Sequence, residues 1–166
     1  MSGQKVQLES KEGQVFEVDR ELLKQSETIN AILVGWESQG KEVSSEVIPL
    51  GEIASEFLQY VLDYCEHHKE DPAPTDDDEE NNDISGWDVA FLENFHNQKL
   101  FNLIMAAYNI RVMKLVGVCC QAVANLVRGK TTEEMRQIYG IQNDFTPEEE
   151  ERIRLENAWC DFDDRF

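Results

Sequence analysis

The chain has little positive charge and no long apolar run. Its 166 residues include 15 Lys and Arg against 34 Asp and Glu, which gives a formal net charge of −19. Because nucleic acids and anionic membranes attract positive charge, we expect neither as a partner. No apolar run approaches the roughly 18 residues that span a bilayer, and the first residues lack the apolar stretch of a signal peptide. We therefore expect a cytoplasmic and nuclear protein.

Cysteine is scarce as well. The four cysteines are Cys65, Cys119, Cys120 and Cys160. Two are adjacent and three lie in helical patterns, which favours reduced thiols over a disulfide framework. The run Cys65-Glu66-His67-His68 does not have the spacing of a zinc-ligand pair, and no second pair lies near it in the sequence. We predict a structural Cys65 followed by a solvated histidine pair, and no metal site.

The sequence also lacks the motifs of an active site. The third histidine, His96, lies in a separate segment and forms no recognisable catalytic dyad. The chain has no Gly-rich phosphate loop and no Gly-x-Ser-x-Gly motif. The acidic run 76–80 lacks the alternating ligands and central glycine of an EF-hand loop. The sequence therefore predicts a protein that is not an enzyme and that binds no cofactor.

The negative charge is concentrated in two segments. Residues 66–83 carry nine acids and one Lys, and residues 144–166 carry nine acids and three Arg. The remainder has the charge balance of an ordinary soluble domain. A stretch as charged as the first segment cannot bury enough apolar surface to fold, so we predict an acidic, disordered loop near residues 71–86.

Hydrophobic periodicity predicts an α/β domain followed by an all-helical half. Short strands are expected at 6–9, 15–18 and 46–50, with Glu12-Gly13 as a hairpin turn. Pro49 indicates that the third strand lies at an edge of the sheet or ends there. Asp19 and Ser26 are candidate N-caps of two helices, and the polar residues 34–45 are predicted to form a loop. Further helices are expected near 53–67, 87–93, 100–108 and 112–127.

Two later helices carry strong local start signals. Thr131 and Glu134 have the spacing of a capping box. Thr146 and Glu149 repeat that spacing, and Pro147 occupies the first helical position, where proline is favoured. We expect the last helix to run to about residue 157.

These late helices bear apolar side chains but have little core of their own. The apolar residues include Ile141, Phe145, Ile153, Leu155 and Trp159. Such side chains either pack back on the domain or bind a partner, and the periodicity alone leaves both outcomes open.

Several short segments match one known family in the same order along the chain. They are Phe16-Glu17-Val18-Asp19, Lys24-Gln25-Ser26-Glu27-Thr28-Ile29, His67-His68-Lys69-Glu70-Asp71-Pro72, Val123-Ala124-Asn125, Gly129-Lys130-Thr131, Asn143-Asp144-Phe145-Thr146-Pro147-Glu148-Glu149-Glu150 and Glu156-Asn157-Ala158-Trp159-Cys160. With these segments the chain resembles the S-phase-kinase-associated adaptor family, the linker subunits of SCF-type cullin-RING ubiquitin ligases. The resemblance extends over about residues 5–160.

The resemblance implies a BTB/POZ fold, in which a small three-stranded sheet is surrounded by helices. That domain would occupy residues 1–128, with a helical F-box-binding extension at 129–160 and a tail at 161–166. It also implies an adaptor without catalytic activity, which joins an F-box substrate receptor to a cullin for ubiquitination and protein degradation. Such an adaptor acts by raising effective concentration and fixing orientation.

The resemblance also assigns contact residues. The F-box surface would comprise Leu100, Phe101, Ile104, Val116, Cys120, Val123, Val127, Ile141 and Trp159, with Trp159 as an anchor for a helix-in-groove contact. Some of the first seven are expected to be core, because two successive amphipathic helices must cover one another. Tyr108 and Asn109 correspond to the pair that contacts the cullin.

The chain departs from the family pattern near that pair. The family has Asn-Tyr where this chain has Tyr108-Asn109, and exchanging neighbours on a helix turns the phenol by about 100°. Arg111 stands where the family has an acid, and Gly117 lies within a predicted helix, at a cost of roughly 0.5–1 kcal/mol relative to Ala. These departures indicate a divergent paralogue. The alternative is a self-assembling homodimer, or an F-box-bound structural scaffold that acts outside a cullin ligase.

Overall fold

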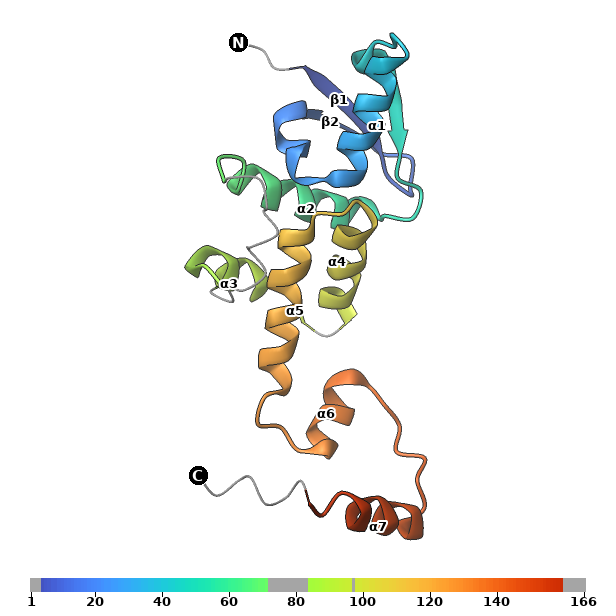
Figure 1. The fold of residues 1–166 in the computed structure, drawn as a ribbon, viewed down its shortest axis with the longest axis vertical. Coiled ribbons are helices and arrows are strands. Elements are labelled where there is room, and N and C mark those ends of the chain that lie inside the picture. Colours follow the sequence, from blue (N-terminus) through green and yellow to red (C-terminus); the bar gives the residue numbers. More distant parts are fainter. Residues whose placement is uncertain (1–3, 72–83, 97, 160–166) are drawn as a thin grey trace. The chain divides into compact units, whose positions relative to one another are not determined.

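The computed structural model describes residues 4–71, 84–96 and 98–159 (Figure 1). The chain divides into two compact units, Met1–Arg128 and Gly129–Phe166. Most of the predicted acidic loop, residues 72–83, lies outside the described residues, as do Cys160 and the predicted tail.

A small sheet begins the first unit. β1 (Lys5–Glu9) pairs antiparallel with β2 (Val15–Asp19) and parallel with β3 (Val47–Pro49), which gives the strand order β2-β1-β3. The predicted turn at Gly13 adopts a φ of +78°, a conformation that favours glycine. Pro49 lies on an edge strand, as predicted, where its missing N–H costs no sheet hydrogen bond.

The other described elements of the first unit are helices. They are η1, a 3₁₀ helix (Arg20–Gln25), α1 (Glu27–Ser38), η2, also a 3₁₀ helix (Val43–Ser45), α2 (Ser55–His67), α3 (Gly86–Leu92), α4 (Gln98–Asn109) and α5 (Met113–Val127). The mixed sheet-and-helix content confirms the predicted α/β fold class.

Two local predictions near α1 have different outcomes. Ser26 caps α1 as predicted, because its hydroxyl accepts a hydrogen bond from the Ile29 N–H at 3.2 Å. Asp19 makes no cap hydrogen bond, and its carboxylate instead lies 3.1 Å from the Lys5 ammonium across the strand pair. The prediction of an Asp19 cap is therefore wrong.

The predicted loop at 34–45 is also largely wrong. α1 continues to Ser38, and the short helix η2 occupies Val43–Ser45. Packing overrides the polar composition of this segment, because Val43 is fully buried and Trp36 packs against the core.

One hydrophobic core contains side chains of the sheet, α2, α4 and α5. α4 packs against both α2 and α5, and Figure 1 shows α4 and α5 side by side. The fully buried side chains of this core include Leu8 of β1, Leu58 and Tyr64 of α2, Leu103 of α4 and Leu115 of α5. Burial raises the pKa of the Cys65 thiol to about 12, consistent with the predicted structural role.

The histidine pair at the end of α2 is not solvated as a pair. His67 is exposed and stacks on Trp87, with ring centroids 3.8 Å apart. His68 is buried, with Nδ1 2.7 Å from an Asp71 carboxylate oxygen and Nε2 2.9 Å from an Asp88 carboxylate oxygen. The prediction is therefore wrong for His68, because carboxylates from two segments replace its water.

The contacts around His68 and Asp71 join α2, α3 and α5 of the first unit. Asp88 is buried on α3, and its other carboxylate oxygen accepts a hydrogen bond from the Ser85 hydroxyl at 2.8 Å. Asp71 also forms an ion pair with Lys114 of α5. The Lys114 ammonium, and then His68, hold the pKa of the Asp71 carboxyl below its ordinary value. Within the described residues, no group of His, Cys, Asp and Glu could hold a metal ion.

The second unit consists of α6 (Thr132–Tyr139), α7 (Pro147–Glu156) and their connection. Both predicted capping boxes are confirmed, because Thr131 and Thr146 each exchange hydrogen bonds with the glutamate three residues later. Gly140 ends α6 with a φ of +65°. Across the described part of the chain, no helix is long and apolar enough to cross a membrane.

Candidate partner-binding surface

Helix α5 changes from buried to exposed along its length. Leu115 and Cys119, four residues apart on one face, are fully buried, and burial raises the pKa of the Cys119 thiol to about 12. From Cys120 onward no described residue of the chain is buried. Val123 and Val127 are half-buried, and Leu126 is exposed although it is apolar. The C-terminal half of α5 therefore presents an apolar face without a complete cover.

Helix α4 supplies part of the predicted surface. Phe101 and Ile104 are half-buried, and the neighbouring Met105 is exposed. Leu100 is only 3% exposed and belongs to the core with Leu103. Some of the assigned residues of α4 and α5 were expected to be core, and Leu100 is one that lies in the core of the free chain.

The predicted residues of the second unit are the most exposed. Trp159 is 75% and Ile141 is 58% exposed. The site assignment omitted Phe145 and Leu155, which are 48% and 64% exposed. Leu155 lies within the predicted last helix and is apolar among charged neighbours, which is the signal that could have added it.

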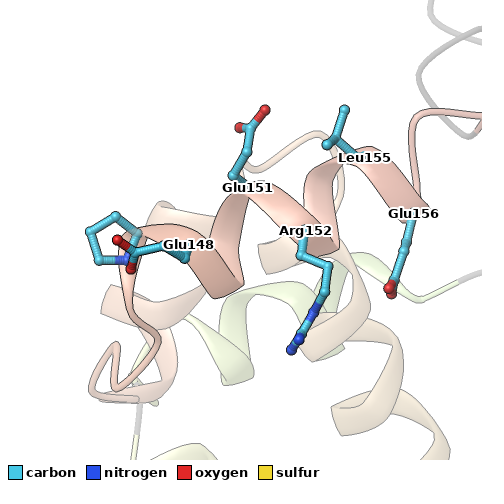
Figure 2. Close-up of a pocket in the computed structure, with 6 residues that line it drawn as sticks. Glu148, Glu151, Arg152, Leu155 and Glu156 are labelled. Atoms are coloured by element: carbon cyan, nitrogen blue, oxygen red, sulfur yellow. The ribbon is translucent and has the colours of Figure 1, made fainter.

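Leu155 projects from α7 in a charged setting. Figure 2 shows its side chain on the same side of the helix as Glu151, with Arg152 and Glu156 displaced around the helix. Together with Pro147 and Glu148, these residues line a shallow, open hollow. The second unit thus combines exposed apolar groups with an acidic surround.

Local hydrogen bonds, not burial, hold the helices of the second unit. The N–H of Thr131 and its hydroxyl hold the pKa of the Glu134 carboxyl below its ordinary value, and Thr146 does the same for Glu149. No described residue of this unit is buried. The apolar side chains of this unit therefore do not form a buried core of their own.

The pair Tyr108-Asn109 lies at the C-terminus of α4. Both side chains are exposed, while Ala107 and Ile110 on either side of the pair are buried. Arg111 follows with a φ of +53°, a left-handed conformation that is rare outside glycine. The Val112 N–H donates to the Ala107 carbonyl at 2.9 Å, as in a Schellman helix end.

A second set of contacts fixes this corner against α1. The Ser26 hydroxyl donates to the Ile110 carbonyl, and the Glu27 N–H donates to the Arg111 carbonyl at 3.3 Å. Tyr108 and Asn109 therefore lie next to a turn that hydrogen bonds hold in place.

Comparisons with known proteins match both units of the chain. A family model described as "Skp1 family, tetramerisation domain" covers residues 4–70. A second, described as "Skp1 family, dimerisation domain", covers residues 113–160. The second match begins at α5, so it includes the exposed apolar half of that helix together with α6 and α7.

Curated relatives match along almost their whole length. The "SCF ubiquitin ligase complex protein SKP1a" of Dictyostelium discoideum is 44% identical over 94% of this chain and 95% of that protein. A "Skp1-related protein" of Caenorhabditis elegans is 39% identical over 94% and 91%. The "SKP1-like protein 18" of Arabidopsis thaliana is 36% identical over 96% and 98%. On this evidence the chain belongs to the Skp1 family.

Proposed function

We propose that this protein is a non-enzymatic adaptor of an SCF-type ubiquitin ligase, which links F-box substrate receptors to a cullin. Membership of the Skp1 family supports the proposal, as do relatives named as SCF ubiquitin ligase complex proteins. One structural observation carries it: after Cys119 no described residue is buried, yet the segment is rich in apolar side chains. A surface of this kind stabilises a complex rather than a core. The proposed compartments are the cytoplasm and the nucleus.

The F-box receptor is proposed to cover the exposed apolar face of α4 and α5 together with the second unit. The contact residues, without Leu100, are Phe101, Ile104, Val116, Cys120, Val123, Val127, Ile141 and Trp159, to which the exposed Leu126 and Leu155 are added. The helical spacing of the side chains on α4 and α5 suits an amphipathic helical partner, whose apolar face would meet theirs.

Replacement of Trp159 tests the F-box assignment. Because large aromatic anchors dominate interface energies, we expect Trp159→Ala to weaken binding to several F-box proteins by about thirty-fold. Val34→Ala, at a position of α1 that is 59% exposed and outside the proposed surface, is the control and should bind normally. Affinities measured by calorimetry with two or more receptors would decide. Normal binding by the Trp159 variant would contradict the assignment.

The cullin contact is proposed at Tyr108 and Asn109. Their exposure on an anchored corner supports this placement. We expect the paired exchange of Tyr108→Asn and Asn109→Tyr, which recreates the family order, to strengthen capture of a cullin N-terminal region. If neither form binds a cullin, the F-box role survives and the ligase role does not.

The exposed apolar residues also favour a second candidate, a homodimer that acts as a structural scaffold. In the absence of a receptor, the same side chains would pair with those of a second copy. Light scattering over micromolar concentrations tests this candidate. A chain that stays monomeric throughout would exclude it, whereas a dimer that an F-box protein dissociates would place both partners on one surface.

A further inference from the structure

The Arg136 side chain is far less exposed than that of the other paired arginine of the second unit, Arg154. Arg136 sits in the last turn of α6, and its side chain is only 15% exposed. By contrast, the side chain of Arg154 on α7 is 70% exposed. Ordering and desolvating a guanidinium costs free energy. The low exposure of Arg136 therefore requires contacts that offset this cost.

The contacts of Arg136 reach three parts of the second unit. Its guanidinium pairs with Glu133 on α6, and a second carboxylate, that of Glu150 on α7, lies 3.6 Å away. The Cζ atom also lies 5.9 Å from the centre of the Phe145 ring in the connection, within the range of a cation–π contact. One side chain thus bridges both helices and the segment between them.

Polar contacts extend this bridge along the connection. The Asn143 amide donates to the same Glu150 carboxylate oxygen at 2.6 Å, and its own oxygen accepts from the Phe145 N–H at 3.2 Å. The Arg136 carbonyl accepts from the Ile141 N–H at 2.9 Å. Ile141, a proposed F-box contact, is therefore held directly by the residue that reaches α7.

We propose that Arg136 is a positioning residue, whose guanidinium sets the orientation of α7 relative to α6 before a partner binds. The inference rests on the proposed F-box function, because its purpose is to present the apolar groups of both helices to one receptor. Since no described residue of this unit is buried, apolar packing does not supply that orientation. A charged bridge does so while leaving Ile141, Leu155 and Trp159 exposed for the receptor.

Pre-orientation lowers the share of the binding free energy that must be spent on ordering the second unit. When only a fraction of the free chain is binding-competent, the apparent affinity falls by that fraction. An exposed ion pair and a cation–π contact together account for roughly a three- to ten-fold change. Arg136→Gln should therefore weaken binding to every F-box receptor by roughly three- to ten-fold, because the defect lies in the free chain.

The decisive experiment measures the orientation of the two helices in the full free chain by NMR residual dipolar couplings. In the wild-type chain, α6 and α7 should share one alignment tensor, and in Arg136→Gln they should not. Arg154→Gln is the matched control: it removes the same charge from a pair with Glu151 that lies within α7. That variant should keep the shared tensor. A shared tensor in Arg136→Gln, or separate tensors in the wild type, would overturn the proposal.

Binding measurements separate this inference from the proposed function. Glu150→Gln retains an acceptor for Asn143 but removes the charge opposite Arg136, so it should weaken binding on its own. It should have little further effect in the Arg136→Gln background. Fully additive effects, or weaker binding with unchanged helix orientation, would mean that Arg136 touches the receptor and would overturn the positioning role. If the wild-type chain binds no F-box protein, the proposed function fails, and the dipolar couplings alone decide the role of Arg136.

Discussion

The longest helices of the first unit and the helices of the second unit are stabilised in different ways. In the first unit the two longest helices, α2 and α5, begin without a side-chain cap but bury apolar residues. In the second, α6 and α7 both have complete capping boxes and bury nothing. Tertiary packing can replace local signals, and local signals can replace packing. A helix held by its own ends keeps its apolar side chains available for another molecule.

Polar side chains that pair across elements show the same division. His68 and Asp88 of the first unit are buried together, and their contacts tie α2 to α3. Arg136 and Glu150 of the second unit pair where the Glu150 side chain is 45% exposed. Buried pairs are costly to break, whereas exposed pairs contribute little to stability. The first unit should therefore respond to substitution through its stability, and the second through its binding.

The largest expected effect separates two adjacent histidines. His68→Ala leaves Asp88 buried without its partner, so the free energy of unfolding should fall by about 3–5 kcal/mol. His67→Ala removes an exposed ring that stacks on Trp87, and should cost less than about 1.5 kcal/mol. Urea unfolding of both variants gives the comparison. Equal losses at the two positions would contradict the assigned burial of His68.

The next comparison uses one leucine from each unit. Leu103→Ala removes a fully buried side chain from α4 and should lower the free energy of unfolding by about 2–5 kcal/mol. Leu155→Ala, at a position 64% exposed on α7, should change it by no more than about 0.5 kcal/mol. The same Leu155 variant should bind F-box receptors more weakly. A Leu155 variant that is destabilised but binds normally would reverse the roles given to the two units.

The sequence predicts the second unit better than the first, and the reason is physical. The capping boxes at Thr131 and Thr146 are local, so their spacing is visible without knowledge of the fold. The burial of Val43 and His68 depends on elements distant along the chain, so polar composition misled the prediction at both places. Leu100 illustrates the same limit: periodicity identifies an apolar face but does not say which of its residues another helix covers.

The family resemblance supplied what periodicity could not. Periodicity left two explanations for the apolar residues of the extension: packing on the domain or binding to a partner. The resemblance implied the second, with an F-box protein as the partner. It could not reveal Arg136, because a bridge from α6 to α7 and Phe145 is a property of three-dimensional arrangement.

Loss of a cap should affect the second unit locally. Thr146→Ala removes the hydroxyl that accepts from the Glu149 N–H, and such losses cost about 1 kcal/mol. We expect the first turn of α7 to fray, seen as loss of helical NMR shifts near residue 147, with the urea midpoint of the first unit unchanged. A lower midpoint for the first unit would show that the two units are not independently stabilised.

Acid should act on the same caps. The Thr131 and Thr146 N–H groups hold the pKa values of Glu134 and Glu149 below the ordinary 4.5. Lowered values mean that the stabilisation is complete above that ordinary value and is lost as the pH falls through the lowered one. The helical NMR shifts of α6 and α7 should therefore decline in that range. The glutamine in Glu149→Gln can still cap the helix but does not titrate, so the helical NMR shifts of α7 should persist at low pH in this variant. If α7 of the variant still loses its helical shifts as in the wild type, this account is contradicted.

The smallest expected effect compares a glycine within α5 with the glycine that follows the end of that helix. Gly117 lies within α5, and a Cβ there would meet nothing within 4 Å, so Gly117→Ala should stabilise by roughly 0.5–1 kcal/mol. Gly129 has a φ of +71°, so Gly129→Ala should instead destabilise by about 1 kcal/mol. Thermal unfolding of both variants shows whether the two substitutions change the stability in opposite directions. The same sign at both positions would contradict the described helix end.

The most direct test of the central claim, that the second unit keeps its apolar side chains for a receptor, is hydrogen exchange of the full chain with and without an F-box protein. We predict that amides of residues 120–159 exchange quickly in the free chain and become strongly protected in the complex. Amides of α2, within the core of the first unit, should exchange slowly and equally in both states. Unchanged exchange across residues 120–159 in a saturated complex would contradict the claim.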